Sequence, residues 1–241
     1  MEPRYRGSTS AKSSVKLYRL FSVSLSTSDR MAVPRWNLEV PPWKTMAFIP
    51  GEYYHLYNRG AHKAPIFLDQ GDYMRFLQLL YVMNNQKQPQ YRGSTSEQVF
   101  RLDRGGTSVD IISYCLMPNH FHLAIRETIE GGTHRFVHKL CTGYSMYYNN
   151  KYDHSGTIFQ GSCKSKHVGN DEYLRYLIQY IHLNPFGIKE PDMNKLAKTE
   201  YLDEAISYSR NYDYSSFKDY LGETRPQASI LANCRGGTSV K

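Results

Sequence analysis

Two histidines at alternate positions are the clearest candidates for chemistry in this chain. His120 and His122 follow Met-Pro-Asn and lie in a segment of β-forming residues. Because alternate side chains of a strand point to the same face, the two imidazoles would project together while Phe121 points into the core. Two imidazoles at this spacing make a metal clamp, although a histidine pair on a strand edge is also common as plain polar surface.

A second segment supplies the residue types that would complete such a site. Tyr180 and Asn184 stand four residues apart in the run Tyr-Ile-His-Leu-Asn. If this run is helical, the two side chains share one face, one turn apart. An amide oxygen suits a third metal ligand, and a phenol is a nucleophile once activated. A lone helical tyrosine is usually a core or surface residue, so only the joint pattern supports this hypothesis.

The two motifs together resemble those of the single-tyrosine HUH transposases, which are IS200-like, and in particular the REP-associated tyrosine transposase branch. The motifs are MPNHFH at 117–122 and YIHLNP at 180–185. Shorter segments follow the family's order across roughly residues 50 to 222, which makes the combination far more specific than any one piece. They are YHLYNRG at 54–60, PIF at 65–67, IFQG at 158–161, DEYL at 171–174 and YSSF at 214–217.

The resemblance implies a role for each candidate residue. His120 and His122 would be the HUH pair, and Asn184 would be the third ligand of a divalent metal, Mg²⁺ or Mn²⁺. Tyr180 would attack the DNA phosphate, giving a 5′-phosphotyrosine and a free 3′-hydroxyl. The substrates implied are single-stranded DNA with hairpins, such as repeated extragenic palindromes. His182 would point away from this site on a helix, and we expect it to be structural.

Basic and aromatic residues near these motifs are candidates for holding single-stranded DNA. A solvated loop is the plainer alternative for the segment after IFQG. Ser162 stands where the family commonly has an arginine, so we do not expect that position to grip the backbone. The candidate DNA-binding residues are Arg59, Phe159, Gln160, Lys164 and Lys166.

The composition predicts a soluble, cytoplasmic protein with an anionic partner. The net charge is +8, but residues 1–50 alone hold eight Lys and Arg against three Asp and Glu. The charge is therefore a weak indication of nucleic-acid binding by the rest of the chain. No apolar run is long enough to cross a bilayer, and the four cysteines lack CxxC spacing, so we expect reduced thiols. We expect a monomer or a homodimer.

The chain divides into three predicted segments. Residues 1–45 are rich in Ser, Thr, Arg and Pro without sustained periodicity, which predicts a disordered extension, and Met46 is a plausible alternative start. Residues 46–222 would form the catalytic domain, and 223–241 a polar tail. YRGSTS occurs at 5–10 and 91–96, and RGGTSV at 104–109 and 235–240. These duplicates are too short to be structural repeats.

The hydrophobic pattern predicts an α+β fold, within the broad α/β class. The sheet would be a central, ferredoxin-like antiparallel one with helices packed on one face. Asn170 is a helix N-cap candidate, Pro185 should end the helix at Asn184, and Gly60 should follow the first strand in a turn with positive φ. His55 on the first strand could approach the metal or simply pack, and packing is favoured. The expected strands are 53–57, 109–116, 120–125 and 164–168; the expected helices are 71–84, 133–150, 171–183 and short ones within 194–222.

Three functions are compatible with these residues. The first is a metal-dependent single-stranded DNA endonuclease and strand transferase of the transposase type, an enzyme that cleaves and rejoins DNA. The second is a hairpin-binding protein, for DNA or RNA, that has lost cleavage; intact Tyr180, His120, His122 and Asn184 argue against it. The third is a metal-dependent hydrolase that uses water. A covalent protein–DNA product would separate the first from the third.

Overall fold

The computed structural model describes residues 47–87, 94–103, 105–192 and 199–232. The predicted extension 1–45, Met46 and residues 233–241 lie outside the described residues. The strands are β1 (Tyr53–Arg59), β2 (Val109–Met117), β3 (His120–Glu127) and β4 (Lys164–Val168). The helices are α2 (Gln70–Met83), α3 (Ser96–Val99), α4 (Gly132–Tyr152), α5 (Asp171–Leu183), α6 (Thr199–Arg210) and α7 (Phe217–Tyr220), with 3₁₀ turns η2 (Ala61–Lys63), η3 (Asn184–Ile188) and η5 (Pro226–Ile230).

The four strands form one antiparallel sheet in the order β2-β3-β1-β4. With α2 between β1 and β2 and α4 between β3 and β4, the chain follows the βαββαβ order of the ferredoxin-like fold. The predicted fold class is confirmed. This order places β1 between β3 and β4, so segments far apart in the sequence become neighbours at the centre of the sheet.

The register of the central strands decides which side chains share a face. Tyr57 of β1 lies directly opposite His122 of β3 and opposite Lys164 of β4, and Arg59 lies opposite His120. Residues paired across an antiparallel ladder point to the same side of the sheet. Five polar or aromatic side chains from three strands therefore line one face.

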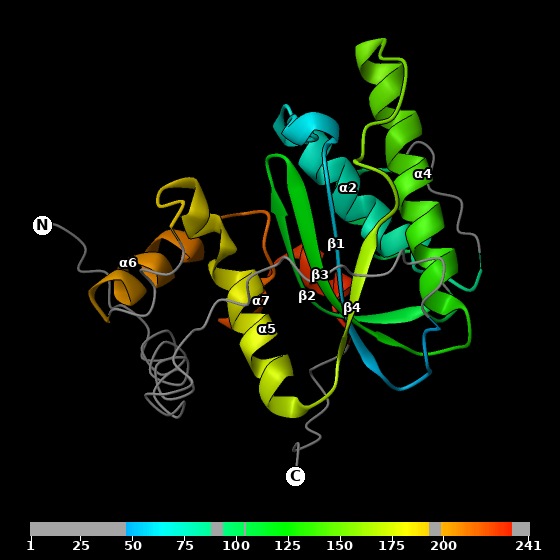
Figure 1. Cartoon of the computed structure of the whole chain (residues 1–241). Helices are drawn as coiled ribbons and strands as arrows, with labels where there is room; N and C mark the ends of the chain where they lie inside the picture. Colours follow the sequence, from blue (N-terminus) through cyan, green and yellow to red (C-terminus); the bar gives the residue numbers. More distant parts are fainter. Residues whose placement is uncertain (1–46, 88–93, 104, 193–198, 233–241) are drawn as a thin grey trace, which may run out of the picture.

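The opposite face of the sheet carries the main hydrophobic core. There α2 and α4 lie side by side against the strands (Figure 1). Phe121 contacts Phe76 of α2 with ring centroids 5.1 Å apart, and Phe76 contacts Tyr144 of α4 at 5.0 Å. Phe121 thus points into the core between the two histidines, as strand alternation predicts.

Helix α5 packs on the other face, so the prediction that helices cover one face is wrong. Leu177 and Ile181 of α5 are buried against Ala124 and Cys115 of the sheet. The sheet face that carries His120 and His122 is thus only partly polar. It also carries small buried side chains, and the apolar side of α5 packs on them. The face of α5 that carries Tyr180 consequently lies over the strands.

Both ends of α5 follow the sequence signals. The side-chain oxygen of Asn170 accepts a hydrogen bond from the backbone N–H of Tyr173 at 2.7 Å, which caps the first turn as predicted. The α-helix ends at Leu183, and Asn184 begins a 3₁₀ turn with Pro185 in its first positions. The backbone thus passes from an α-helix into a 3₁₀ turn at the proline and does not become extended. Asn184 remains buried.

The turn after β1 differs from its prediction. Gly60 has φ −60°, and the positive φ values fall instead on His62 and Lys63. Glycine is needed at this position for space, because an added Cβ would lie 2.1 Å from the carbonyl oxygen of Ala64. The Gly60 N–H donates to the Asn119 carbonyl at 2.8 Å, so this turn ties the β2–β3 hairpin to the end of β1.

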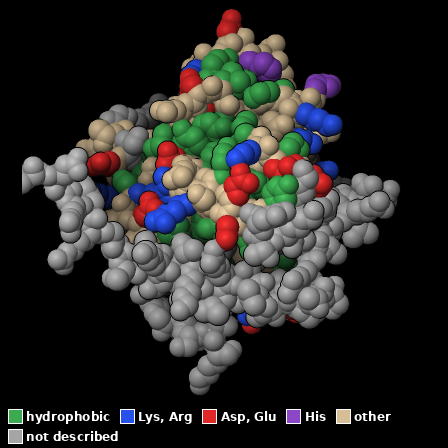
Figure 2. Space-filling model, turned by 90° about the vertical axis from the view of Figure 1, so that its left-hand side faces the viewer, with side chains coloured by type: hydrophobic (Ala, Val, Ile, Leu, Met, Phe, Trp, Pro, Cys, Tyr) green, Lys and Arg blue, Asp and Glu red, His purple; other side chains and the backbone are tan. Residues whose placement is uncertain are grey.

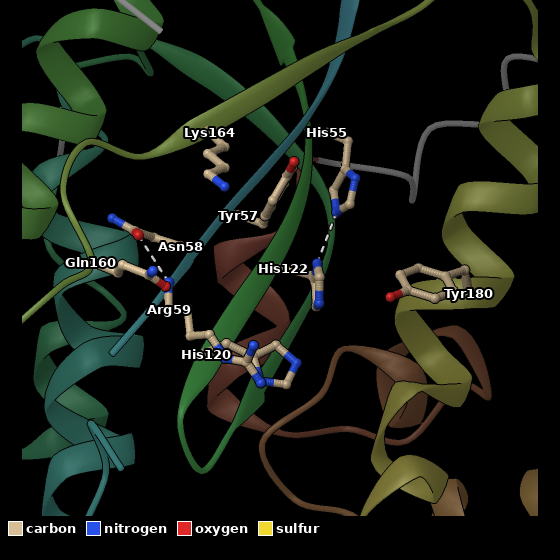
Figure 3. A pocket seen from close by; sticks show the side chains of 9 residues that line it. All are labelled: His55, Tyr57, Asn58, Arg59, His120, His122, Gln160, Lys164 and Tyr180. Carbon is tan, nitrogen blue, oxygen red and sulfur yellow. Dashed lines mark hydrogen bonds between the residues drawn. The ribbon is translucent and has the colours of Figure 1, made fainter. Parts of the chain in front are cut away.

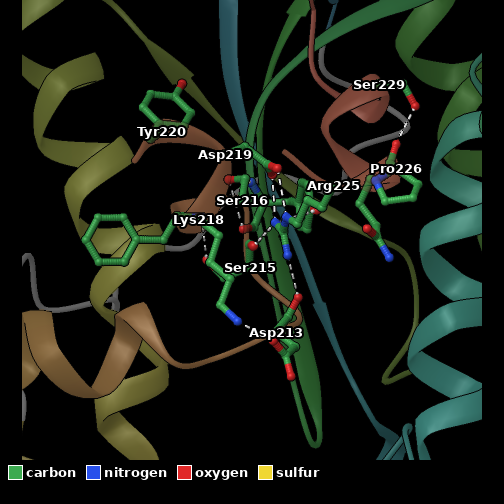
Figure 4. Close-up of polar contacts among 12 residues, drawn as sticks. Asp213, Ser215, Ser216, Lys218, Asp219, Tyr220, Arg225, Pro226 and Ser229 are labelled. Carbon is green, nitrogen blue, oxygen red and sulfur yellow. Dashed lines mark hydrogen bonds and ion pairs between the residues drawn. The ribbon is translucent and has the colours of Figure 1, made fainter. Parts of the chain in front are cut away.

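The folded unit continues past residue 222, where we placed the end of the catalytic domain. Arg225 inserts its guanidinium beside the sheet, donating to the Asp219 carboxylate at 2.7 Å and to the Ser215 carbonyl (Figure 4). Ile230 is buried in the main core, and the Ala232 N–H donates to Ile111 of β2 at 2.9 Å. Residues 223–232 therefore cover the β2 edge.

The surface on the side of α5 and α6 carries charges of both signs. Figure 2 shows acidic and basic side chains intermixed among the described residues visible on this face. Because the charges on this face are intermixed, attraction of a polyanion here would depend on local groups rather than on one broad basic surface.

No helix within the described ranges is long and apolar enough to cross a membrane.

Candidate active site

A pocket of about 300 Å³ opens on the histidine face of the sheet, between β1, β3, β4 and α5. Figure 3 shows histidines at its centre, Tyr180 entering from α5, and polar or basic side chains on the opposite side. The pocket is lined by His55, Tyr57, Asn58, Arg59, His120, His122, Gln160, Lys164 and Tyr180. The structure thus brings together the two histidines and the tyrosine that the sequence selected.

The orientation of His120 is fixed by its neighbours. Its Nδ1 lies 2.6 Å from the side-chain oxygen of Asn119, and its Nε2 lies 3.3 Å from the side-chain oxygen of Asn184. A neutral imidazole has one N–H; with the hydrogen on Nδ1, it donates to the Asn119 oxygen. The Nε2 lone pair then faces the Asn184 oxygen. Two acceptor atoms at this distance are well placed to share a cation.

The second histidine, His122, is held by His55, the histidine of the first strand that the sequence analysis favoured as a packing residue. Its Nδ1 lies 2.9 Å from Nε2 of His55 on β1, with the ring centroids 5.1 Å apart and the ring planes inclined by 25° (Figure 3). His55 is fully buried, as the packing prediction requires, but it also lines the pocket. Tyr57 also lines the pocket, and the sequence analysis did not propose it as a site residue.

Burial keeps all three imidazoles neutral at physiological pH. Desolvation lowers the pKa of His120 to about 4 and that of His55 to about 3, and it holds the pKa of His122 well below its ordinary value. Neighbouring positive charge adds to the effect, from Arg59 at His120 and from Lys166 at His55. Neutral imidazoles present lone pairs, which is the form that metal ions bind.

Tyr180 reaches the pocket from the last turns of α5. Its ring meets that of His122 edge to face, with centroids 5.5 Å apart. Burial raises the pKa of the phenol to about 12, although a hydrogen bond with the Asn184 side chain opposes the shift. The phenol is therefore protonated at neutral pH. Asn184 directly follows α5 and keeps helical backbone angles, so Tyr180 and Asn184 lie one turn apart on the same side of the chain.

The predicted DNA-binding residues fall into two sets. Arg59, Gln160 and Lys164 line the pocket opposite Tyr180 (Figure 3). Lys166 lies outside the lining, with its Nζ 5.0 Å from the ring centroid of Tyr173. Phe159 is buried in the core beside Phe121 and Tyr144, so it presents no ring to a nucleic acid and that prediction is wrong.

The donor set fits a divalent metal ion by its chemistry. Within the described ranges, no three His, Cys, Asp or Glu side chains gather as a metal site. The candidate set here is two imidazoles and one amide oxygen. Adjacent ligands of an octahedral ion, each about 2.1 Å from it, lie about 3 Å apart. The 3.3 Å between His120 Nε2 and the Asn184 oxygen is compatible with that spacing.

One protein-family model matches part of this chain. A family model described as "Transposase IS200 like" matches residues 93–184, the segment that contains His120, His122, Tyr180 and Asn184. The predicted resemblance to IS200-like transposases is confirmed. The solved structure of a REP-associated tyrosine transposase bound to a REP hairpin is 12% identical, with a TM-score of 0.46 over 80% of this chain and 93% of that chain. No curated protein matches significantly.

Proposed function

We propose that this protein is a metal-dependent single-stranded DNA endonuclease and strand transferase that works through a covalent tyrosine intermediate. The observation that carries the proposal is the meeting of the Tyr180 phenol and the His120–His122 pair in one pocket, with the Asn184 side-chain oxygen 3.3 Å from His120 Nε2. The IS200-like family match supports a transposase, and the pocket supports this chemistry for it. The site lies inside the described domain, which we take to begin near Met46.

Tyr180 is the proposed nucleophile. Its Oη would form a bond to the scissile phosphorus while the bond from phosphorus to the 3′-oxygen breaks. The phenolic proton ends on that oxygen, so the products are a 5′-phosphotyrosine and a free 3′-hydroxyl. The bond energy is conserved in the phosphotyrosine, so attack by a 3′-hydroxyl rejoins DNA without an external energy source.

His120, His122 and Asn184 would hold the divalent ion, Mg²⁺ or Mn²⁺. Bound there, the ion would supply positive charge that neutralises the phosphate and favours attack by an anionic or weakly acidic nucleophile. The chain's own cations contribute from the opposite wall, where Arg59 and Lys164 face the pocket. Their charge would orient the phosphate with its leaving oxygen directed away from Tyr180.

The proposed substrate is single-stranded DNA beside a hairpin, such as a repeated extragenic palindrome, acted on by a monomer or homodimer in the cytoplasm. The IS200-like family match and the basic side of the pocket support it. Arg59, Gln160 and Lys164 are the proposed contacts for the backbone. Lys166 is a second-choice contact because it packs on Tyr173.

The experiment that tests this function uses end-labelled hairpins with single-stranded flanks, taken from sequence beside the gene. The full chain is incubated with and without Mn²⁺, and the products are denatured before electrophoresis. A labelled adduct that survives denaturation and depends on Mn²⁺ is expected. Cleavage without an adduct would indicate a water-using hydrolase. Binding of the hairpin with no cleavage under any metal would indicate the alternative, a non-cleaving hairpin-binding protein.

A further inference from the structure

His55 and His122 form a buried imidazole pair at the centre of the sheet. The nitrogens His55 Nε2 and His122 Nδ1 are 2.9 Å apart, and the rings are inclined by 25°. The two residues come from different strands, and Ala124, which lies directly opposite His55, leaves room for the two rings. His55 has no exposed surface, and His122 is 7% exposed.

This pair permits two proton arrangements with different consequences. In one, His122 donates its Nδ1–H to His55, and the His122 Nε2 keeps a lone pair. In the other, His55 donates its Nε2–H to His122, and the His122 Nε2 carries the hydrogen. A metal ion binds only the lone pair. The acceptor role of His55 therefore decides whether His122 can act as a ligand.

We infer that His55 is a positioning residue, which accepts the Nδ1–H of His122 and so presents the His122 Nε2 lone pair to a divalent metal. The inference rests on the proposed function for the role of the metal, whereas the 2.9 Å contact between the two nitrogens stands on geometry alone, and either ring can be its donor. Partners of this kind orient ligating histidines in metal sites and are usually carboxylates, backbone carbonyls or water. His120 has an equivalent partner in the Asn119 oxygen.

The charge of the pocket gives a reason for a histidine in this role. None of the nine residues that line it is an acid. A carboxylate behind His122 would orient the ring equally well, but it would place a negative charge beside the position proposed for a phosphate. A neutral imidazole accepts the same hydrogen bond without that repulsion. If His55 served packing alone, an apolar side chain would fill the space without burying polar atoms.

Two substitutions separate hydrogen bonding from packing. His55→Gln keeps an acceptor near the position of the imidazole Nε2, whereas His55→Leu removes the acceptor and keeps the bulk. Leu56→Ala is the matched control, because Leu56 is a buried neighbour on the same strand whose side chain points to the opposite face. It weakens the core without contacting His122. Thermal unfolding of each variant shows that it is folded.

The first measurement is Mn²⁺ binding by calorimetry. His55→Leu should weaken binding by about 10- to 100-fold, as expected for loss of a partner behind a ligand. His55→Gln should recover most of the affinity, and Leu56→Ala should match the wild type. Equal affinity in the wild type and a folded His55→Leu variant would overturn the inference. A wild type that does not bind Mn²⁺ would instead remove the metal from the proposed function.

The second measurement needs no metal, so it decides the inference even in that case. Long-range proton–nitrogen spectra of the metal-free wild type report which nitrogen of His122 carries the hydrogen. The Nδ1–H form should predominate, and His55→Leu should shift the population towards Nε2–H. A wild-type spectrum dominated by the Nε2–H form of His122 would overturn the assignment of His55 as the acceptor.

Discussion

Tyr180 of α5 and His122 of β3 meet edge to face across the pocket, with ring centroids 5.5 Å apart. The contact joins the two halves of the candidate site, because the helix supplies the phenol and the sheet supplies the imidazoles. The two halves come from motifs that are well separated in the sequence. Their approach is the geometric basis for the predictions on catalysis that follow.

Tyr180→Phe should abolish the covalent adduct and strand cleavage while hairpin binding is retained. Only the hydroxyl is removed, so the free energy of unfolding should change by no more than about 1 kcal/mol. Adduct formation and gel-shift affinity are measured side by side. Tyr176→Phe is the matched control on the same helix, and it should cleave normally. Cleavage that persists in Tyr180→Phe and disappears in Tyr176→Phe would identify Tyr176, one helical turn earlier, as the nucleophile.

His120→Ala and His122→Ala should each lose metal-dependent cleavage, with a smaller loss of DNA affinity. Each substitution removes one of two imidazole ligands while the basic wall of the pocket stays in place. Calorimetric titration with Mn²⁺ checks the assignment. His182→Ala is an informative comparison, since His182 is also fully buried but contacts Ser216 rather than the pocket. Unchanged metal binding in both pocket variants would show that the clamp is misassigned.

Strandedness of the substrate should matter strongly. The phenol on α5 and the histidines on β3 must reach one phosphate from different sides, and a flexible single strand adopts the required bend more readily than a duplex. A hairpin with an unpaired flank should be cleaved, and the same hairpin should be cleaved poorly once a complementary oligonucleotide pairs that flank. Both reactions are run at the same salt and metal concentration. Equal rates would favour an ordinary duplex nuclease.

Asp72 should make the fold sensitive to acid. Its buried carboxylate accepts hydrogen bonds from Lys151 Nζ at 2.8 Å and from the Leu68 N–H at 2.7 Å. Burial by itself raises the pKa of Asp72, but these hydrogen bonds outweigh it, so the pKa lies below its ordinary value. The stabilisation is present above the unfolded pKa of about 3.9 and is lost as pH falls through the folded value.

Urea unfolding of Asp72→Asn against the wild type measures this contribution. At pH 7 the variant should be less stable by about 2 to 4 kcal/mol, because Lys151 loses a charged partner and the α2 cap is weakened. The difference should shrink below about pH 4, where the wild-type carboxylate becomes protonated. A difference that stays constant from pH 7 to pH 3 would contradict the role given to Asp72.

A chain that starts at Met46 should fold and cleave like the full chain. Residues 1–45 lack the periodicity of a core-forming segment, and the described fold begins directly after them. Since residues 1–50 hold eight Lys and Arg against three Asp and Glu, DNA affinity should fall and depend less on salt. Adduct yield and affinity at several salt concentrations are the measurements. Aggregation of the shortened chain would assign the extension to the domain.

Local signals predicted the parts of the site that depend on one segment. Strand alternation placed His120 and His122 on one face, and the Asn170 cap with the helical spacing of Tyr180 and Asn184 defined α5. These features depend on neighbours within a few residues, so the sequence displays them directly.

The features that the sequence did not reveal depend on how distant segments pair. His55 faces His122 only because β1 lies beside β3 in one particular register, and a shift by one residue would turn it to the other side. Phe159 looked like a surface aromatic, but an isolated bridge to Gly60 turns its segment towards the core. The side on which α5 packs likewise follows from the small residues Ala124 and Cys115, which lie on separate strands.

Ala124 and Cys115 also influence the geometry of the pocket. Tyr180 lies on α5 and Asn184 is its C-cap residue, so a displacement of α5 would move the phenol and the amide together. The gap between that helix and the imidazoles is set by the layer of side chains beneath Leu177 and Ile181, none of which lines the pocket. Ala124 and Cys115 therefore set the distance between α5 and the sheet, and through it the distance between Tyr180 and the imidazoles, although neither side chain lines the pocket.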